Sequence, residues 1–143
     1  MDARTLSAGL SVGPQITPED IATLASQGIR TIICNRPDGE AEGQPPFARI
    51  AEAAEASGIE ARCLPVTPGR ITDADVTAFA RVLSDLPGPA HAYCRTGTRS
   101  AMLWAMTMAG TEPLEDIVAS TGAAGYDLGP LMPRLSARDA TPG

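Results

Sequence analysis

Residues 93–100 read YCRTGTRS, and this run organises both the architecture and the candidate chemistry of the chain. Upstream, Pro87-Gly88-Pro89 breaks the chain before an apolar, strand-like segment at residues 90–93. Downstream, the apolar run at residues 100–108 is typical of a buried helix. Cys94 therefore opens a glycine-containing loop between a strand and a helix. In that order the loop N–H groups and the positive end of the helix dipole point at the sulfur, which favours the thiolate and any anion beside it.

Strand-like and helix-like segments alternate along the rest of the chain. Thr17 and Asp20 predict a capping box that starts a helix ending at Gly28, and Thr72 predicts the cap of a helix over residues 75–86. The other predicted helices are 47–57, 100–108, and two short ones near 114–119 and 128–135; the predicted strands are 29–34, 59–66 and 90–93. This alternation predicts an α/β fold of three layers, with a mostly parallel central sheet flanked by helices. Right-handed crossovers then place the strand-to-helix loops along one edge, where active sites form.

The bulk properties of the chain limit its class. A length of 143 residues suits one domain, 1–143, with a core at about residues 5–135 and flexible ends. The net charge of −6 argues against a nucleic-acid partner, and no apolar stretch is long enough to cross a membrane, so we expect a soluble cytoplasmic protein. Three widely spaced cysteines and a single histidine, His91, fit neither a disulfide framework nor a zinc motif. We therefore expect reduced thiols, no metal and no cofactor.

The surroundings of Cys94 indicate a reactive site. A cysteine at a strand end is more often a buried core residue than a catalyst. Here Arg95 and Arg99 lie within five residues of it, and buried arginines beside an inert thiol would lack an anionic partner. Gly97 lets the backbone close tightly, and Ser100 is expected to cap the helix or bond the thiolate.

Several further motifs accompany the run YCRTGTRS. Residues 13–20, 35–40 and 65–69 read GPQITPED, NRPDGE and PVTPG. Together these motifs resemble the bacterial phosphatase-like domain family of β-lactamase hydrolase-like proteins, often fused to, or encoded beside, metallo-β-lactamase-fold sulfur dioxygenases. The resemblance covers about residues 5–110. It implies a fold like that of tyrosine and dual-specificity phosphatases, and an activity of either phosphate hydrolysis or sulfur transfer in sulfide and persulfide metabolism.

The length of the loop favours sulfur transfer. The tyrosine-phosphatase signature has five residues between its cysteine and arginine, whereas four separate Cys94 from Arg99. A phosphate dianion presents three oxygens to be wrapped by amides and a bidentate arginine, so a shorter loop is expected to bind it less well. The spacing is similar to that of rhodanese-type sulfurtransferases. We therefore expect a sulfurtransferase whose Cys94 carries a sulfane sulfur as a persulfide from a small anionic donor to a thiol acceptor, with a sulfur dioxygenase as a candidate partner.

Two alternatives stay open. One is a phosphatase in which Cys94 forms a thiophosphate intermediate from a phosphorylated substrate, and the other is a non-catalytic thiol sensor or anion-binding adaptor. For a phosphatase, residues 66–69 (VTPG) hold no carboxylate where the general acid is expected, so Asp38 and Asp73 are candidates for the acid. Each also has a structural interpretation: Asp38 as a turn residue and Asp73 as a carboxylate in the first turn of a helix. The candidate catalytic residues are Cys94, Arg99 and Asp38, and the candidate anion- or substrate-binding residues are Arg95, Thr96, Gly97, Thr98, Ser100 and Arg36.

Cysteine, tryptophan and methionine side chains outside the loop carry open alternatives. Cys34 and Cys63 lie at or near the ends of two predicted strands, so either could resolve an oxidised Cys94 as a disulfide, or both are small buried hydrophobes. On the helix after the loop, four large side chains line a substrate groove or, as their spacing favours, pack in the core: Met102, Trp104, Met106 and Met108.

Overall fold

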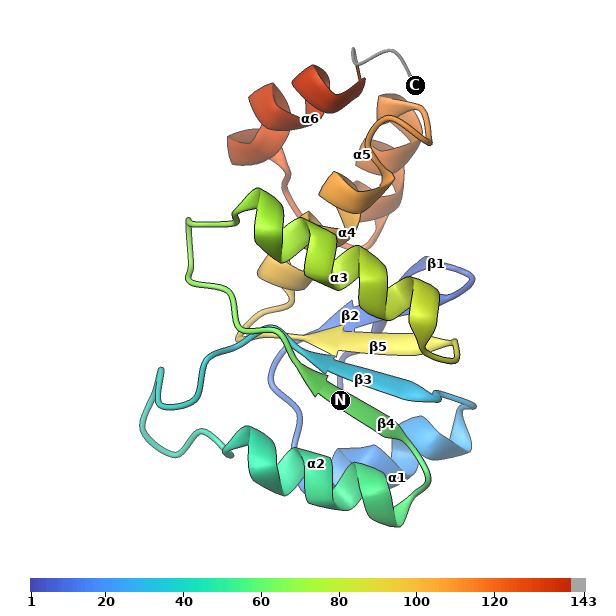
Figure 1. Cartoon of the computed structure of the whole chain (residues 1–143), viewed down its shortest axis with the longest axis vertical. Helices are drawn as coiled ribbons and strands as arrows, with labels where there is room; N and C mark the ends of the chain where they lie inside the picture. Colours follow the sequence, from blue (N-terminus) through green and yellow to red (C-terminus); the bar gives the residue numbers. More distant parts are fainter. Residues whose placement is uncertain (140–143) are drawn as a thin grey trace.

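The computed structural model describes residues 1–139, in which a five-stranded sheet lies between two groups of helices (Figure 1). Its strands are β1 (Arg4–Ser7), β2 (Leu10–Gly13), β3 (Thr31–Cys34), β4 (Glu60–Cys63) and β5 (Ala90–Tyr93). The spatial order is β1-β2-β5-β3-β4, and every neighbouring pair is parallel except the antiparallel pair β1–β2. The predicted three-layer α/β fold with a mostly parallel sheet is confirmed.

The helices begin largely where the capping residues predict. They are α1 (Pro18–Ser26), α2 (Phe47–Ala56), α3 (Asp73–Asp85), α4 (Thr98–Met108), α5 (Leu114–Ala123), the 3₁₀ turn η1 (Gly129–Leu131) and α6 (Met132–Asp139). Thr17 with Asp20 and Thr72 with Asp75 form the two capping boxes, in which each side chain accepts the other residue's backbone N–H. Two N–H groups at each helix start are thereby satisfied.

The N-terminal hairpin β1–β2 is the part of the sheet that the sequence pattern does not predict. Its strands have four residues each, too few for a clear alternation, although Val12 is fully buried. β2 pairs with β5 along its whole length, which makes β5 the central strand. Arg4 begins β1, next to the predicted core limit at about residue 5, and its Nη1 donates to the carbonyl oxygen of Ala124 (2.7 Å). The helix α6 continues beyond the predicted core limit at residue 135, and residues 140–143 lie outside the described part.

The sheet separates two hydrophobic clusters. Ala92 of β5 belongs to the cluster formed with α3 and α4, whereas the next residue, Tyr93, belongs to the cluster formed with α1 and α2. The loops that follow β3, β4 and β5 leave the same edge of the sheet (left in Figure 1). Cys94 lies at this edge, at the end of the central strand. No helix within residues 1–139 has the length and apolar character needed to span a bilayer.

Candidate active site

Cys94 directly follows β5 and is enclosed by the short loop that leads into α4. Its exposed fraction is 1%. Gly97 is the N-cap residue of α4 with φ of 96°, in the left-handed region that favours glycine. The Gly97 N–H donates to Cys94 Sγ at 3.1 Å. This hydrogen bond and the amino end of α4 both stabilise negative charge on the sulfur.

The loop is also held from outside by Tyr126, which follows α5. The Tyr126 hydroxyl donates to the carbonyl oxygen of Thr96 (3.3 Å), and a Cβ added to Gly97 would collide with that hydroxyl. The hydroxyls of Thr96 and Thr98 bond each other at 2.9 Å. Gly97 is therefore required both by its backbone conformation and by the close approach of Tyr126.

Arg99 lies in the first turn of α4 and is 8% exposed. Its Nη1 donates to Glu40 Oε2 (2.7 Å) and to the carbonyl oxygen of Val66 (2.8 Å), and its Nη2 donates to Glu40 Oε1 (2.8 Å). A guanidinium carries five N–H groups, so these three bonds leave the Nε–H and one Nη2–H. Those two groups share one edge of the plane, and Arg99 also interacts with the Cys94 sulfur, so this edge can bind an anion held beside that sulfur.

Glu40 is the site residue that the sequence analysis does not identify. Besides Arg99, its carboxylate accepts from Arg36 Nε (3.0 Å), and its side chain is only 19% exposed. The hydrogen bonds from Arg99 chiefly, and from Arg36, lower the pKa of Glu40, so the carboxylate is ionised at neutral pH. Burial opposes the charge of Arg99, but the Glu40 carboxylate and the Cys94 sulfur outweigh it and leave the pKa of Arg99 raised. The available signal was the need of a buried arginine for an anionic partner.

Two predicted binding residues have other partners. Arg36 is buried, and it donates through Nε to Glu40 and through Nη1 to Gln15 Oε1 (3.0 Å). Arg36 therefore supports Glu40, and the binding of an anionic substrate by Arg36 stays a prediction. Ser100 donates through Oγ to Asn35 Oδ1 (2.8 Å), and its contact with the thiolate or a bound anion stays a prediction. The buried Ser100–Asn35 bond joins α4 to the end of β3.

The two candidate acids are engaged at helix starts and on the surface. Asp38 Oδ1 accepts the N–H of Phe47 at the start of α2 (2.9 Å), which agrees with the turn reading. Asp73, at the start of α3, accepts from Arg134 (3.3 Å) and Arg138 (3.5 Å). In these positions each carboxylate has a structural partner.

A cavity of about 530 Å³ opens beside the loop. Its lining residues are Pro68, Gly69, Ile71, Arg95, Thr96, Thr98, Arg99, Met102, Pro130, Leu131 and Arg134. Arg95 is exposed, and within residues 1–139 its guanidinium has no hydrogen bond or ion pair. Met102 lines this groove, while Trp104 and Met106 of the same helix are buried in the core.

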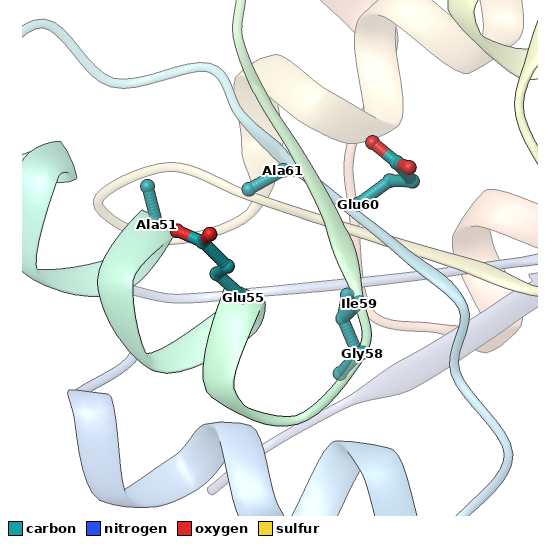
Figure 2. Close-up of a pocket in the computed structure, with 6 residues that line it drawn as sticks. All are labelled: Ala51, Glu55, Gly58, Ile59, Glu60 and Ala61. Carbon is teal, nitrogen blue, oxygen red and sulfur yellow. The ribbon is translucent and has the colours of Figure 1, made fainter.

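A second hollow, of about 460 Å³, lies between α2 and β4 (Figure 2). Its lining includes Glu55 and Glu60 but none of the candidate site residues. Two carboxylates make it unsuited to an anionic substrate. Among residues 1–139, no group of three or more His, Cys, Asp or Glu side chains is arranged to hold a metal.

Cys34 and Cys63 lie opposite each other on the parallel strands β3 and β4. Cys34 is buried and its thiol donates to the carbonyl oxygen of Arg36 (3.2 Å), whereas Cys63 is exposed. A hydrogen bond from Cys63 lowers the pKa of Cys34 to about 7, and the same contact raises the pKa of Cys63. The two thiols are thus partners of each other, and their use in resolving an oxidised Cys94 stays a prediction.

The geometry of the Cys94 loop identifies the fold class of the domain. A central-strand cysteine in a glycine-capped loop, followed by an arginine in the first helical turn, places the domain with the tyrosine- and dual-specificity-phosphatase-like fold. The chain belongs to the family of the phosphatase-like domain of β-lactamase hydrolase-like proteins, whose model matches residues 2–111.

Known proteins similar to the chain agree with this placement. A β-lactamase hydrolase-like protein of Agrobacterium fabrum is 35% identical over 130 residues, which cover 90% of this chain and 30% of that protein. The chain thus spans under a third of this relative's length. A crystal structure from Neisseria meningitidis, of a protein proposed to be a phosphatase, is 38% identical with a TM-score of 0.87, covering 96% of this chain and 99% of that one. Pseudomonas aeruginosa TpbA, solved in complex with phosphotyrosine, shares the fold at 18% identity and a TM-score of 0.66, over 98% of this chain and 83% of that one.

The expectation of a rhodanese-type sulfurtransferase is wrong. The matching family is phosphatase-like, and the similar structures are described as phosphatases. The persulfide on Cys94, the sulfur donor, the thiol acceptor and the sulfur dioxygenase partner lose their support with it. The spacing argument fails because Arg99 lies in the first turn of α4, where Glu40 and Val66 fix its guanidinium near the sulfur despite the shorter loop.

Proposed function

We propose that this domain hydrolyses phosphomonoesters with Cys94 as the nucleophile. The observation that carries the proposal is the pairing of an enclosed sulfur, bonded to the Gly97 N–H, with a guanidinium that Glu40 holds beside that sulfur. A phosphoryl group needs such a nucleophile and such a guanidinium. The fold shared with a phosphotyrosine-binding protein agrees with this assignment.

The reaction has two displacements. The Cys94 thiolate attacks phosphorus, a sulfur–phosphorus bond forms, and the ester oxygen leaves with the electron pair of the broken bond. Water then attacks the phosphocysteine, which releases inorganic phosphate and restores the thiolate. Arg99 stabilises the charge on the transferring phosphoryl oxygens in both steps.

The leaving group is the demanding part of this reaction. No carboxylate lines the cavity within the described residues, and Asp38 and Asp73 have structural partners. Departure of an alkoxide is slow when no side chain donates a proton to it, so phosphate esters of acidic alcohols and phenols are the better substrates. We expect kcat/KM to rise steeply as the pKa of the leaving alcohol falls.

The test is release of inorganic phosphate from 4-nitrophenyl phosphate, together with intact-protein mass after rapid acid quenching. We expect turnover and a transient gain of one phosphoryl group, located on Cys94 by peptide mapping. Cys63→Ser is the matched control, because Cys63 is a thiol away from the loop and should leave both signals unchanged. Absence of phosphate release and of the adduct with wild-type protein would refute the proposal.

A further inference from the structure

The cavity beside the Cys94 loop is larger than a phosphoryl group requires. Its volume of about 530 Å³ falls in the range of sites that enclose a small organic molecule. Part of its lining is apolar and comes from three separate segments. Ile71 precedes α3, Met102 lies on α4, and Leu131 ends η1.

This apolar lining is a fixed part of the fold. Ile71 and Leu131 belong to the core cluster, and Met102 packs against the same cluster. Arg134 of α6 donates to the carbonyl oxygen of Ile71, which joins the C-terminal helix to the segment before α3. The residues of η1 and α6 lie beyond residues 2–111 that the family model matches, so family membership does not assign this wall.

Apart from two threonine hydroxyls, the polar side chains of the cavity are arginines. Arg95, Arg99 and Arg134 line it, and no Asp, Glu, Asn or Gln does so among the described residues. The hydroxyls of Thr96 and Thr98 already bond each other. A sugar or other polyol needs acceptors for its hydroxyl protons, and a nucleobase gains from an aromatic ring to stack on. The described lining has no carboxylate or amide side chain to accept from a polyol, and no aromatic ring.

We propose that this cavity binds the organic part of an apolar phosphomonoester, with the phosphoryl group at Cys94 and hydrocarbon against Ile71, Met102 and Leu131. The inference rests on the proposed function, because the phosphoryl position determines which end of the substrate enters the cavity. Phosphates of sugars and nucleotides are disfavoured, since the wall of Ile71, Met102 and Leu131 would take their hydroxyls and bases out of water without supplying hydrogen-bond partners. The unpaired Arg95 adds attraction for the dianion at the exposed part of the loop.

Calorimetric titration of the wild-type protein with three non-hydrolysable phosphonates of equal charge tests this selectivity. The probes are methylphosphonate, n-hexylphosphonate and 3,4-dihydroxybutylphosphonate. We expect the hexyl compound to bind about 20-fold more tightly than the methyl compound, which corresponds to full burial of about two of its five additional methylenes at about fourfold in Kd for each. The diol should bind no more tightly than methylphosphonate. Equal affinity for the hexyl and methyl compounds, or tighter binding of the diol, would overturn the proposal.

Two methionines of α4 provide a matched pair of variants. Met102 and Met108 are both half-buried and pack against the same cluster, but only Met102 is part of the cavity lining. Met102→Ala should reduce the hexyl preference to about fivefold through the lost hydrocarbon contact, while Met108→Ala leaves it unchanged. Thermal melts show whether both variants fold. Equal effects of the two substitutions would refute the assignment of the cavity.

The experiments distinguish failure of the proposed hydrolysis from failure of the proposed cavity binding. Turnover of 4-nitrophenyl phosphate without any hexyl preference would remove the cavity assignment and leave the proposed function standing. A hexyl preference that depends on Met102, in a protein with no turnover and no phosphocysteine, would remove the proposed function and leave an apolar anion site. Absence of turnover, adduct and phosphonate binding would remove both.

Discussion

Cys94 and Cys34 stand at the ends of neighbouring strands of one sheet, yet their surroundings differ in kind. Cys34 is in register with Tyr93, so the two thiols are one residue apart along the strand direction. Cys94 Sγ accepts a hydrogen bond from the Gly97 N–H and lies at the amino end of α4, with Arg99 beside it. The Cys34 thiol donates to the carbonyl oxygen of Arg36 and forms a hydrogen bond with the thiol of Cys63. The segment after each strand therefore sets the chemistry, because a short glycine loop turns a helix start toward one sulfur only.

Removal of each thiol gives the largest predicted difference between the two regions. Cys94→Ser should lower kcat/KM for 4-nitrophenyl phosphate by about 10⁴-fold or more, as expected for loss of a nucleophile. Cys34→Ser should change it by less than about threefold, because Cys34 supplies no group to the reaction. Comparable losses in the two variants would show that the β3 region shares the chemistry.

The guanidinium beside Cys94 gives the next effect. Arg99→Lys should lower kcat/KM by about 100-fold, because a point charge cannot bind Glu40 and a phosphoryl group through a planar fork at once. Arg81→Lys is the control, since Arg81 is an exposed arginine on α3 that does not line the cavity. Near-wild-type turnover of Arg99→Lys would contradict the geometric role of the fork.

Glu40 tests whether the fork must be held in place. Glu40→Gln should lower kcat by about tenfold, because the amide NH2 group cannot accept, so one of the two parallel hydrogen bonds from Arg99 is lost and the guanidinium is held less firmly. The loss should fall mainly on kcat, with a small change in KM. Glu42→Gln, an exposed carboxylate of the same loop, is the control. If both variants lose activity alike, the effect comes from loop charge and Glu40 is no positioning residue.

The same contrast explains how much the sequence could predict. The strand at residues 90–93, the helix caps at Thr17 and Thr72, and the Cys94 loop follow from local patterns. Glu40 was missed because its role depends on a contact with Arg99, 59 residues away, which no local pattern encodes. The sulfur-transfer expectation failed for a related reason. It used the number of loop residues, whereas the position of Arg99 depends on where α4 begins and on partners from two other loops.

The smallest predicted effect concerns the Cys34–Cys63 pair. Neighbouring strands are about 4.8 Å apart, which lies within the Cα separation that a disulfide spans, and these two residues are in register. Diamide, an azo oxidant, should accept two electrons and two protons from the pair and leave a disulfide between them. Because the pKa of Cys34 is lowered to about 7, the thiolate fraction and the oxidation rate should rise with pH and level off above about 7.

Peptide mapping should find the Cys34–Cys63 bond in wild-type protein and in Cys94→Ser, and should not find it in Cys63→Ser. Activity should fall only a few-fold, through the bond between the Cys34 thiol and the carbonyl of Arg36, which supports Glu40. A disulfide that joins Cys94 to either thiol would instead show that the two regions exchange oxidation and that the sheet does not keep them apart.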